Sequence, residues 1–271
     1  MIYSLDSVSK VYVQGRTNVR ALRGISLQVK EGEHIALLGH SGAGKSTLFR
    51  LLNATIRPTS GAVSFEGHDL SDLTGTQIRA VRRRIGTIYQ QHNLVPALTV
   101  LQNTLCGGLG RWSFAHTLKG MFRPQRQDLD RALSAIESVG LADKRHARAN
   151  ELSGGQQQRV AIARTLMQEP EVILADEPIA SLDPRLADEI IDLLTRIASE
   201  NRRTLLVSMH KAELAIQRLS RAVALREGTV EFDLASSHVS EKLLKQLYSS
   251  GTVAAKPKMQ SGFRNEFNCL S

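Results

Sequence analysis

Apolar residues recur along the chain in two spacings, one typical of buried strands and one typical of helices. Four stretches carry an unbroken apolar run of strand length, which predicts strands buried on both faces. They are residues 33–39 (EHIALLG), 84–90 (RIGTIYQ), 171–177 (EVILADE) and 203–210 (RTLLVSMH). Helices are predicted from about Lys45 to Asn53 and from Pro184 onward, where proline is tolerated in the first turn. Strands that alternate with helices predict an α/β fold with a mostly parallel core sheet.

Two antiparallel regions are predicted, one near each end of this pattern. Residues 3–13 and 21–29 alternate in short apolar stretches and are separated by the polar QGRTNVR, which is typical of an antiparallel hairpin or small sheet. Residues 221–232 (RAVALREGTVEF) predict a hairpin with its turn at Glu227-Gly228. The sheet is therefore expected to be mixed at its margins.

A helical subdomain is predicted as an insertion at about residues 92–160. Within it, apolar residues repeat at spacings of three and four, the pattern of an amphipathic helix. They are Leu129, Ala132, Leu133, Ile136 and Val139. Residues 107–125 are less regular and predict a loop with a short helix. From about Ser249 the chain mixes small and polar residues without period, so we expect one domain over residues 1–249 and a mobile tail over residues 250–271.

Composition and charge bear on whether the chain binds nucleic acid or an anionic membrane surface. The chain has 271 residues, a hydrophobic share of 42% and a net charge of +9. Its basic residues are scattered and no aromatic residues interleave with them. We therefore expect a solvated surface and no nucleic-acid partner, while attraction to an anionic membrane surface stays open. The two widely separated cysteines, Cys106 and Cys269, favour a reducing compartment.

No secretory or membrane-spanning segment is predicted. Asp6 interrupts the apolar stretch that a signal peptide would need, and the longest apolar runs fall far short of the ~20 residues of a membrane span. The sequence therefore predicts a protein that is either soluble or peripheral to a membrane.

The stretch GHSGAGKST, residues 39–47, matches the pattern of a phosphate-binding loop, G-x-x-x-x-G-K-[ST], between a predicted strand and a predicted helix. Glycines let backbone N–H groups surround an anion, and the helix N-terminus adds about half a positive charge. Lys45 is predicted to reach the β- and γ-phosphates of ATP, and the Ser46 hydroxyl to ligate Mg²⁺. The candidate nucleotide-binding residues are Gly39, His40, Ser41, Gly42, Ala43, Gly44, Lys45, Ser46 and Thr47.

Two carboxylates follow the predicted strand of residues 172–175 (VILA). Asp176 lies at the exposed end of this strand, where its carboxylate can hold Mg²⁺ directly or through water. Glu177 is offset to the other side of the strand end and is not needed for the metal. We therefore predict that Glu177 orients and deprotonates the attacking water, with a salt-bridged strand end as the alternative.

A second stretch typical of a phosphate cradle is LSGGQQQR, residues 152–159, in which a serine and two glycines open a predicted helix. With the loop at 39–47, LSGGQ, and ILADE at 173–177 in that order, the chain resembles the nucleotide-binding subunits of ABC transporters. The resemblance covers nearly all of residues 1–250. It implies a P-loop NTPase fold of the ABC type, with a mostly parallel core sheet, an N-terminal antiparallel β-subdomain and an inserted α-helical subdomain.

The resemblance also implies a head-to-tail homodimer, in which the signature loop of each subunit closes over the ATP held by the other. That loop is Ser153, Gly154, Gly155 and Gln156, and the loop that crosses the interface is Ser181, Leu182 and Asp183. Tyr12 matches the aromatic residue that stacks on adenine, with a strand residue of the core as the alternative. His210 matches the switch histidine that contacts the γ-phosphate.

Gln90 matches the glutamine that reaches the metal and the water and senses the membrane partner. The metal ligands implied are Ser46, Gln90 and Asp176, and the catalytic residues implied are Lys45, Gln90, Glu177 and His210. The cofactors expected are therefore ATP and Mg²⁺.

Three stretches resemble the phosphonate-import branch of the family: NLVPALTVLQNTLCGGLGRWS, ADEPIASLDP and the long insertion around FAHTLKGMF. The chain departs from that branch at Gly107-Gly108, where AGRLGR is typical, and at Ser208-Met209, where Asn or Leu commonly precedes the switch histidine. Both departures lie outside the implied nucleotide contacts. They therefore bear on the substrate and leave the ATPase prediction unchanged.

This branch implies a bacterial complex of two ATPase subunits, a membrane permease dimer and a periplasmic substrate-binding protein that acts through the permease. The ATPase is then expected to be peripheral, at the cytoplasmic face of the inner membrane, with the groove beside Gln90 receiving a cytoplasmic helix of the permease. Alternatives are import of phosphite or another small oxyanion, export or extraction of lipid-linked material, and the ATPase of a soluble carbon–phosphorus cleavage complex. A DNA-repair ATPase would require a long coiled coil, for which the insertion is too short.

Overall fold

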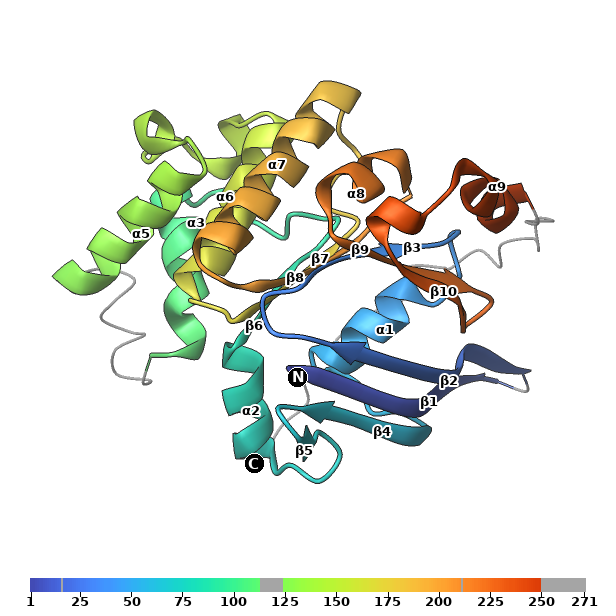
Figure 1. The fold of residues 1–271 in the computed structure, drawn as a ribbon. Coiled ribbons are helices and arrows are strands. Elements are labelled where there is room, and N and C mark those ends of the chain that lie inside the picture. The colour runs from blue at the N-terminus through green and yellow to red at the C-terminus, as the bar shows by residue number, and fades with distance from the viewer. Residues whose placement is uncertain (16, 113–123, 211, 250–271) are drawn as a thin grey trace.

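The computed structural model describes residues 1–15, 17–112, 124–210 and 212–249, and its strands form two sheets (Figure 1). The smaller sheet is antiparallel, with strand order β2-β1-β4-β5. Its strands are β1 (Tyr3–Gln14), β2 (Thr17–Val29), β4 (Ser60–Phe65) and β5 (His68–Asp69). The larger sheet has the order β10-β9-β3-β8-β7-β6, and its neighbouring strands are parallel except for the β10–β9 pair. Its strands are β3 (His34–Leu38), β6 (Ile85–Ile88), β7 (Val172–Asp176), β8 (Thr204–Ser208), β9 (Arg221–Arg226) and β10 (Thr229–Ala235).

Helices cover both faces of the larger sheet. The α-helices are α1 (Lys45–Leu52), α2 (Gly75–Arg83), α3 (Val100–Leu105), α5 (Arg126–Ser138), α6 (Gly154–Met167), α7 (Pro184–Glu200), α8 (Ala212–Arg218) and α9 (Glu241–Ser249). The 3₁₀ helices are η1 (Cys106–Gly110), η2 (Ala142–Lys144), η3 (Ala149–Glu151) and η4 (Ser236–His238). Figure 1 shows α1 between the two sheets, and α6, α7 and α8 across the other face of the larger sheet. Every helix in the described ranges is too short or too polar to span a bilayer.

Side chains of the central strands alternate between two hydrophobic cores, because successive residues of a strand point to opposite faces of a sheet. In β7, Ile173 and Ala175 lie in the core under α6 and α7, whereas Val172 and Leu174 lie in the core around α1. All four side chains are fully buried. Burial on both faces explains the unbroken apolar runs in the sequence, and the parallel pairing confirms the predicted α/β fold.

The amphipathic face predicted for residues 129–139 is confirmed in α5. Ala132, Ile136 and Val139 are fully buried, and Leu129 and Leu133 are half-buried. Residues 113–123, which hold most of the loop predicted at 107–125, lie outside the described residues. The tail predicted over residues 250–271 also lies outside them.

The predicted hairpin at residues 221–232 is confirmed, since Glu227 and Gly228 form its turn with φ angles of 49° and 82°. At the N-terminus the structure differs from the prediction. Most of the polar stretch QGRTNVR, residues 14–20, belongs to the two paired strands and does not form a long loop between them. Pairing continues to Gln14 opposite Thr17. Backbone hydrogen bonds sustain these strands although the residues from Thr17 to Arg20 are exposed, so burial gave no signal there.

Three α-helices of the described residues, α2, α8 and α9, have no counterpart in the predictions. α8 has seven residues and buries Ala212 and Ala215. α2 contains no fully buried residue, so its apolar pattern is weak. α9 is only nine residues long and contributes Leu244 and Leu247 to the core. Short helices of this kind are stabilised mainly by tertiary packing, which a single sequence does not display.

Candidate functional site

The phosphate-loop sequence forms a tight turn between the end of β3 and the start of α1. Gly39 and Gly44 have φ angles of 142° and 109°, a region that favours glycine. A Cβ on Gly44 would lie 2.7 Å from the Ala21 carbonyl oxygen, and one on Gly39 would clash with the Leu225 carbonyl oxygen. Strands β2 and β9 therefore press against the loop and fix its path.

Lys45 opens α1, and its side chain is only 4% exposed. The ammonium group donates to the carbonyl oxygens of Gly39 at 2.7 Å and His40 at 3.1 Å, and lies 3.7 Å from Glu177 Oε1. Burial lowers the pKa of Lys45, and the negative charges of Glu177 and Asp176 partly offset this effect. The cation is therefore held between the loop backbone and a carboxylate.

The carboxylates after β7 form one cluster with residues from the end of β8. The Ser208 hydroxyl donates to Asp176 Oδ1 at 2.6 Å and accepts from the Glu177 N–H at 2.9 Å. Glu177 has a φ of 50°, which is uncommon for a residue other than glycine. His210 Nε2 lies 2.7 Å from Glu177 Oε1. The Glu177 carboxylate thus lies between the His210 imidazole and the Lys45 ammonium.

These groups meet because the carboxyl ends of parallel strands lie at one edge of a sheet. β3, β8 and β7 are neighbours in that order, so the phosphate loop, His210 and the Asp176-Glu177 pair follow adjacent strands. Gln90 lies two residues after β6, the next strand, and its side chain is exposed. Ser46, in the first turn of α1, is exposed as well. The sequence-predicted groups therefore share one edge of the sheet.

The oxygen donors at this edge fit a magnesium ion. Asp176 offers a carboxylate, Ser46 a hydroxyl and Gln90 an amide oxygen, all hard ligands of the kind that Mg²⁺ prefers. Within the described ranges, no group of three or more His, Cys, Asp or Glu side chains surrounds a common metal position. Mg²⁺ is usually held by one or two carboxylates together with phosphates, which is the arrangement these donors suit.

The second candidate cradle begins α6. The Ser153 hydroxyl accepts from the Gln156 N–H, and the Gln156 side chain accepts from the Ser153 N–H at 3.1 Å, a reciprocal cap. The helix starts at Gly154, directly after its N-cap Ser153. A Cβ on Gly155 would lie 3.1 Å from Leu186 of α7, and Asp183 caps α7 by accepting from the Leu186 N–H at 3.1 Å. The N-termini of α6 and α7 therefore lie side by side.

This pair of helix N-termini is a separate site within the chain. Ser153, Gly154 and Asp183 are exposed there, and the first N–H groups of each helix have no partner within the helix. In the described part of the chain, no hydrogen bond or ion pair joins these residues to the loop of residues 39–47. The chain thus has two exposed features typical of anion-binding sites, the phosphate loop before α1 and the paired N-termini of α6 and α7, and they do not contact each other.

Tyr12 lies in β1 opposite Val19 of β2 and is half-buried. Lys10 Nζ is 5.4 Å from the centre of its ring. Ala21, whose carbonyl contacts the phosphate loop, lies two residues from Val19 on the same strand. The aromatic residue that β1 gives to the hydrophobic core is Tyr3, which is fully buried, so Tyr12 is not a core residue.

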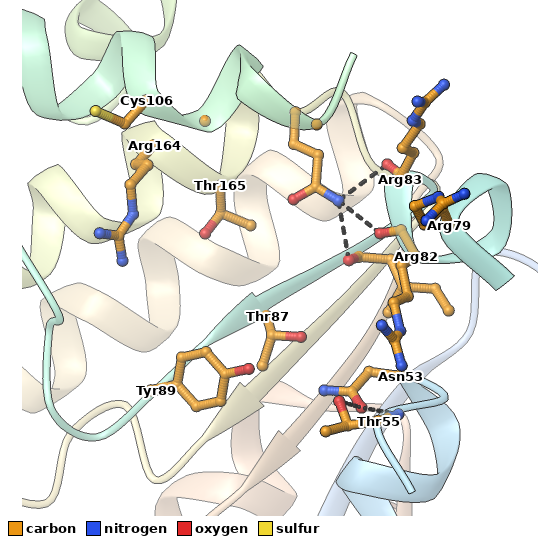
Figure 2. Close-up of a pocket in the computed structure, with 14 residues that line it drawn as sticks. Asn53, Thr55, Arg79, Arg82, Arg83, Thr87, Tyr89, Cys106, Arg164 and Thr165 are labelled. Atoms are coloured by element: carbon orange, nitrogen blue, oxygen red, sulfur yellow. Dashed lines mark hydrogen bonds between the residues drawn. The ribbon is translucent and has the colours of Figure 1, made fainter. Parts of the chain in front are cut away.

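A basic groove of about 500 Å³ lies beside β6. Figure 2 shows Arg79, Arg82 and Arg83 on one side of the groove and Arg164 on the other. Tyr89 lies near the end of β6. The Tyr89 side chain is 44% exposed. No Asp or Glu is among the described residues that line the groove, so its charge is positive throughout.

Arg164 links this groove to the segment that follows Gln90. Its guanidinium donates to the carbonyl oxygens of Asn93 at 2.6 Å and His92 at 2.8 Å. Gly107 packs on the same helix, because a Cβ there would clash with the Arg164 carbonyl oxygen. Gly108, which stands where AGRLGR has its arginine, packs on Trp112, since a Cβ there would lie 2.9 Å from the ring.

Ser208 is a site residue that sequence reasoning noted only as a departure from a family pattern. It is fully buried and pairs with Asp176 across the β7–β8 ladder. The available signal was a hydroxyl residue at the end of an otherwise apolar strand. The register that brings it to Asp176 depends on the sheet and is not visible in the sequence.

Comparison with known proteins identifies the family of this chain. The family model described as ABC transporter matches residues 22–180. The chain is 41% identical over 243 residues to the phosphonates import ATP-binding protein PhnC of Lactococcus lactis subsp. cremoris, covering 90% of this chain and 97% of that protein. It is 47% identical over 239 residues to the protein of the same name from Anaeromyxobacter dehalogenans, with 88% of this chain matched. The chain spans about half, 47%, of the length of that second relative.

Solved structures of transporter cassettes have the same fold. MJ0796, a bacterial ABC transporter cassette solved as a dimer, superposes with a TM-score of 0.75 at 33% identity, covering 86% of this chain and 98% of that one. CbiO1 of Clostridium perfringens, part of the ABC transporter complex cbiONQ, gives a TM-score of 0.77 at 28% identity, covering 90% and 93%. These matches confirm the predicted ABC-type fold. The chain therefore belongs to the ABC transporter family, as one of its ATP-binding and ATP-hydrolysing subunits.

Proposed function

We propose that this subunit hydrolyses ATP in a head-to-tail dimer to drive phosphonate import, as a peripheral protein at the cytoplasmic face of a bacterial inner membrane. The observation that carries the catalytic part is the contact of Glu177 with both Lys45 and His210 beside the phosphate loop. The cargo rests on the relatives, whose names state phosphonate import. The described site offers the cargo itself no binding role.

In this proposal the loop of residues 39–47 binds the phosphates of ATP. Its backbone N–H groups and the N-terminus of α1 surround the anion. The Lys45 ammonium exchanges its two carbonyl partners for the β- and γ-phosphates, because hydrogen bonds between charged groups are the stronger ones. Tyr12, outside the core and close to the β2 segment that touches the loop, stacks on the adenine.

Ser46, Asp176 and Gln90 would hold Mg²⁺ at the edge of the sheet. When bound, the ion neutralises charge on the β- and γ-phosphates. Ser208 holds one oxygen of Asp176 through its 2.6 Å hydrogen bond, which fixes the direction of the carboxylate. Gln90 lies two residues after β6, and the preceding residue, Tyr89, lines the basic groove.

Glu177 acts as the general base. It accepts a proton from the attacking water as the water oxygen bonds to the γ-phosphorus and the bond to the β–γ bridging oxygen breaks, releasing ADP and phosphate. The carboxylate is fixed for this role by the contact with His210 and by the backbone bonds of Glu177 to Ser208. His210 then contacts the γ-phosphate from the neighbouring strand.

The second cradle serves the ATP held by the partner subunit. Ser153, Gly154, Gly155 and Gln156 begin α6, whose N-terminus carries about half a positive charge. Asp183 lies beside them at the start of α7 and crosses the interface. The dimer reported for MJ0796 supports this assembly. Two helix N-termini, exposed and side by side, give each subunit a surface that fits an anion on its partner.

The basic groove beside β6 receives a cytoplasmic helix of the permease. Its four arginines and its lack of acidic lining residues, within the described chain, fit a segment that carries Asp or Glu. Arg164 couples the position of this permease helix to the backbone after Gln90, because its guanidinium is hydrogen-bonded to the carbonyl oxygens of His92 and Asn93. The periplasmic substrate-binding protein acts only through the permease.

Ser208→Ala is expected to lower kcat for ATP about tenfold and to raise the Mg²⁺ concentration needed for half-maximal turnover, because Asp176 and the Glu177 N–H each lose a hydrogen bond. Steady-state phosphate release at varied Mg²⁺ measures both effects. Ser220→Ala, which removes a serine bond to the His34 carbonyl away from the site, is the matched control. Unchanged turnover and Mg²⁺ dependence in Ser208→Ala would contradict the positioning role.

Growth on a phosphonate as sole phosphorus source tests the cargo. A strain that lacks this gene is complemented with wild type or with Glu177→Gln, and is grown in parallel on phosphite and on phosphate. We expect a defect confined to phosphonate that only the wild type rescues. A defect on phosphite as well would favour a broader oxyanion importer. Normal uptake with loss of carbon–phosphorus cleavage in extracts would favour the soluble complex.

A further inference from the structure

The last described helix, α9, packs on the core and ends against the phosphate loop. Leu244 and Leu247 are 6% and 2% exposed and belong to the core beneath α7 and α8. The Ser240 hydroxyl accepts from the Leu243 N–H at 3.3 Å and caps the start of the helix. Figure 1 shows α9 beside the end of β3, where the phosphate loop begins. Burial of one face therefore holds the C-terminal turn of α9 at that position.

The contact between α9 and the loop is made by Tyr248 and His40. His40 Nε2 lies 3.1 Å from the Tyr248 carbonyl oxygen, and because a carbonyl only accepts, this nitrogen carries the hydrogen. The last carbonyls of a helix have no partner within it, so His40 caps the C-terminal end of α9. The two rings also meet edge to face, with centroids 5.0 Å apart and planes at 73°.

The phenol of Tyr248 reaches the first residue of the loop. Burial raises its pKa, and the backbone of Gly39 partly offsets this effect. The hydroxyl is shielded from solvent and has no well-formed hydrogen bond in the described structure. Tyr248 thus contacts His40 through both its ring and its own carbonyl, and its phenol lies near the backbone of Gly39.

We propose that Tyr248 is a positioning residue for the phosphate-binding loop and acts through His40. The His40 carbonyl accepts from Lys45 Nζ at 3.1 Å. His40 therefore contacts α9 through its side chain and Lys45 through its backbone carbonyl. A loop already held in its binding conformation loses less freedom when ATP binds, which favours affinity. The effect falls on binding of ATP and spares the proton transfer from water to Glu177, which directly follows β7. This inference rests on the proposed assignment of residues 39–47 to the phosphates.

The test uses the full chain and four variants, Tyr248→Ala, His40→Ala, the double variant and Lys242→Ala. Lys242 is an exposed residue of the same helix and is the matched control. We expect each single variant of the contact to raise the Kd and the KM for MgATP about tenfold. We expect the double variant to be no worse than His40→Ala, within about twofold, because His40→Ala already removes both the ring contact and the bond to the Tyr248 carbonyl, whereas Tyr248→Ala removes the ring contact alone. The kcat of Tyr248→Ala at saturating ATP should stay within about twofold of wild type.

Three outcomes would overturn the proposal. One is an unchanged Kd in folded Tyr248→Ala, and the second is additive effects in the double variant. The third is a fall in kcat with an unchanged KM in Tyr248→Ala, with an unfolding temperature lowered as far as in Leu244→Ala, a core variant of the same helix, which would assign α9 to stability alone. If Tyr248→Ala fails to fold, Tyr248→Leu keeps the apolar volume and answers the same question.

Lys45→Ala separates this inference from the site assignment on which it rests. If Lys45→Ala keeps the wild-type Kd for MgATP, the assignment of the loop to the phosphates fails. If Lys45→Ala loses affinity and Tyr248→Ala does not, the loop assignment stands and the role of Tyr248 fails.

Discussion

Glu177→Gln is expected to bind ATP and to hydrolyse it at least about a hundredfold more slowly than the wild type. Glutamine keeps the size of the side chain but cannot accept a proton from the attacking water. Because hydrolysis reopens the closed dimer, the variant should persist as an ATP-bound dimer in the presence of Mg²⁺. Phosphate release measures turnover, and size-exclusion chromatography with and without ATP measures the dimer.

The control for this variant is Glu31→Gln, which neutralises an exposed glutamate in the turn before β3. It should hydrolyse ATP at the wild-type rate and show no stable dimer. Normal turnover in Glu177→Gln would remove Glu177 from the catalytic role and leave its contacts with Lys45 and His210 as structural ones. Slow turnover without a persistent dimer would separate the chemical step from the closure of the two subunits.

Ser153→Arg is expected to leave nucleotide binding by the monomer intact and to abolish closure of the dimer. Ser153 is exposed at the start of α6 and makes no described contact with the phosphate loop of its own chain. In the proposed assembly it faces the ATP of the partner, where an arginine side chain would clash. Titration of a fluorescent ATP analogue measures binding by the monomer, and the dimer is measured in the background of Glu177→Gln.

Ser153→Ala is the matched control, because both variants remove the N-cap of α6, a loss of ~1 kcal/mol in stability. Only the arginine adds bulk and positive charge at the interface. Closure that survives in Ser153→Ala and fails in Ser153→Arg would support the clash. Loss of nucleotide binding by the isolated Ser153→Arg monomer would contradict the action of this loop on the partner's ATP.

Much of the fold was predictable because its signals are local. The central strands are buried on both faces, so each appears in the sequence as an apolar run. The phosphate loop is predictable for a different reason. The backbone at Gly39 and Gly44 has positive φ angles, which favour glycine, so the loop requires glycine at these positions. The helices that were not predicted lack such signals, because α2 buries no residue fully, and the short α8 and α9 depend on packing against the core.

The candidate site was predictable in its members and not in its connections. Their place after a buried strand pointed to Asp176 and Glu177, and the family resemblance pointed to His210. These residues meet because the carboxyl ends of parallel strands share one edge of the sheet. The hydrogen bond that joins Ser208 to Asp176 depends on the β7–β8 register. Register is set by how complete strands pair across the sheet, so a single stretch of sequence does not reveal it.

The sequence by itself determined which residues are the candidates for the chemistry, because a phosphate loop, a carboxylate pair and a helix-opening Ser-Gly-Gly each need specific side chains at fixed spacing. The tertiary structure decided which of them touch. It placed Glu177 between Lys45 and His210, kept the signature loop apart from the phosphate loop, and set Tyr248 against His40. Contacts between residues far apart in the chain follow from packing, and packing is a property of the whole fold.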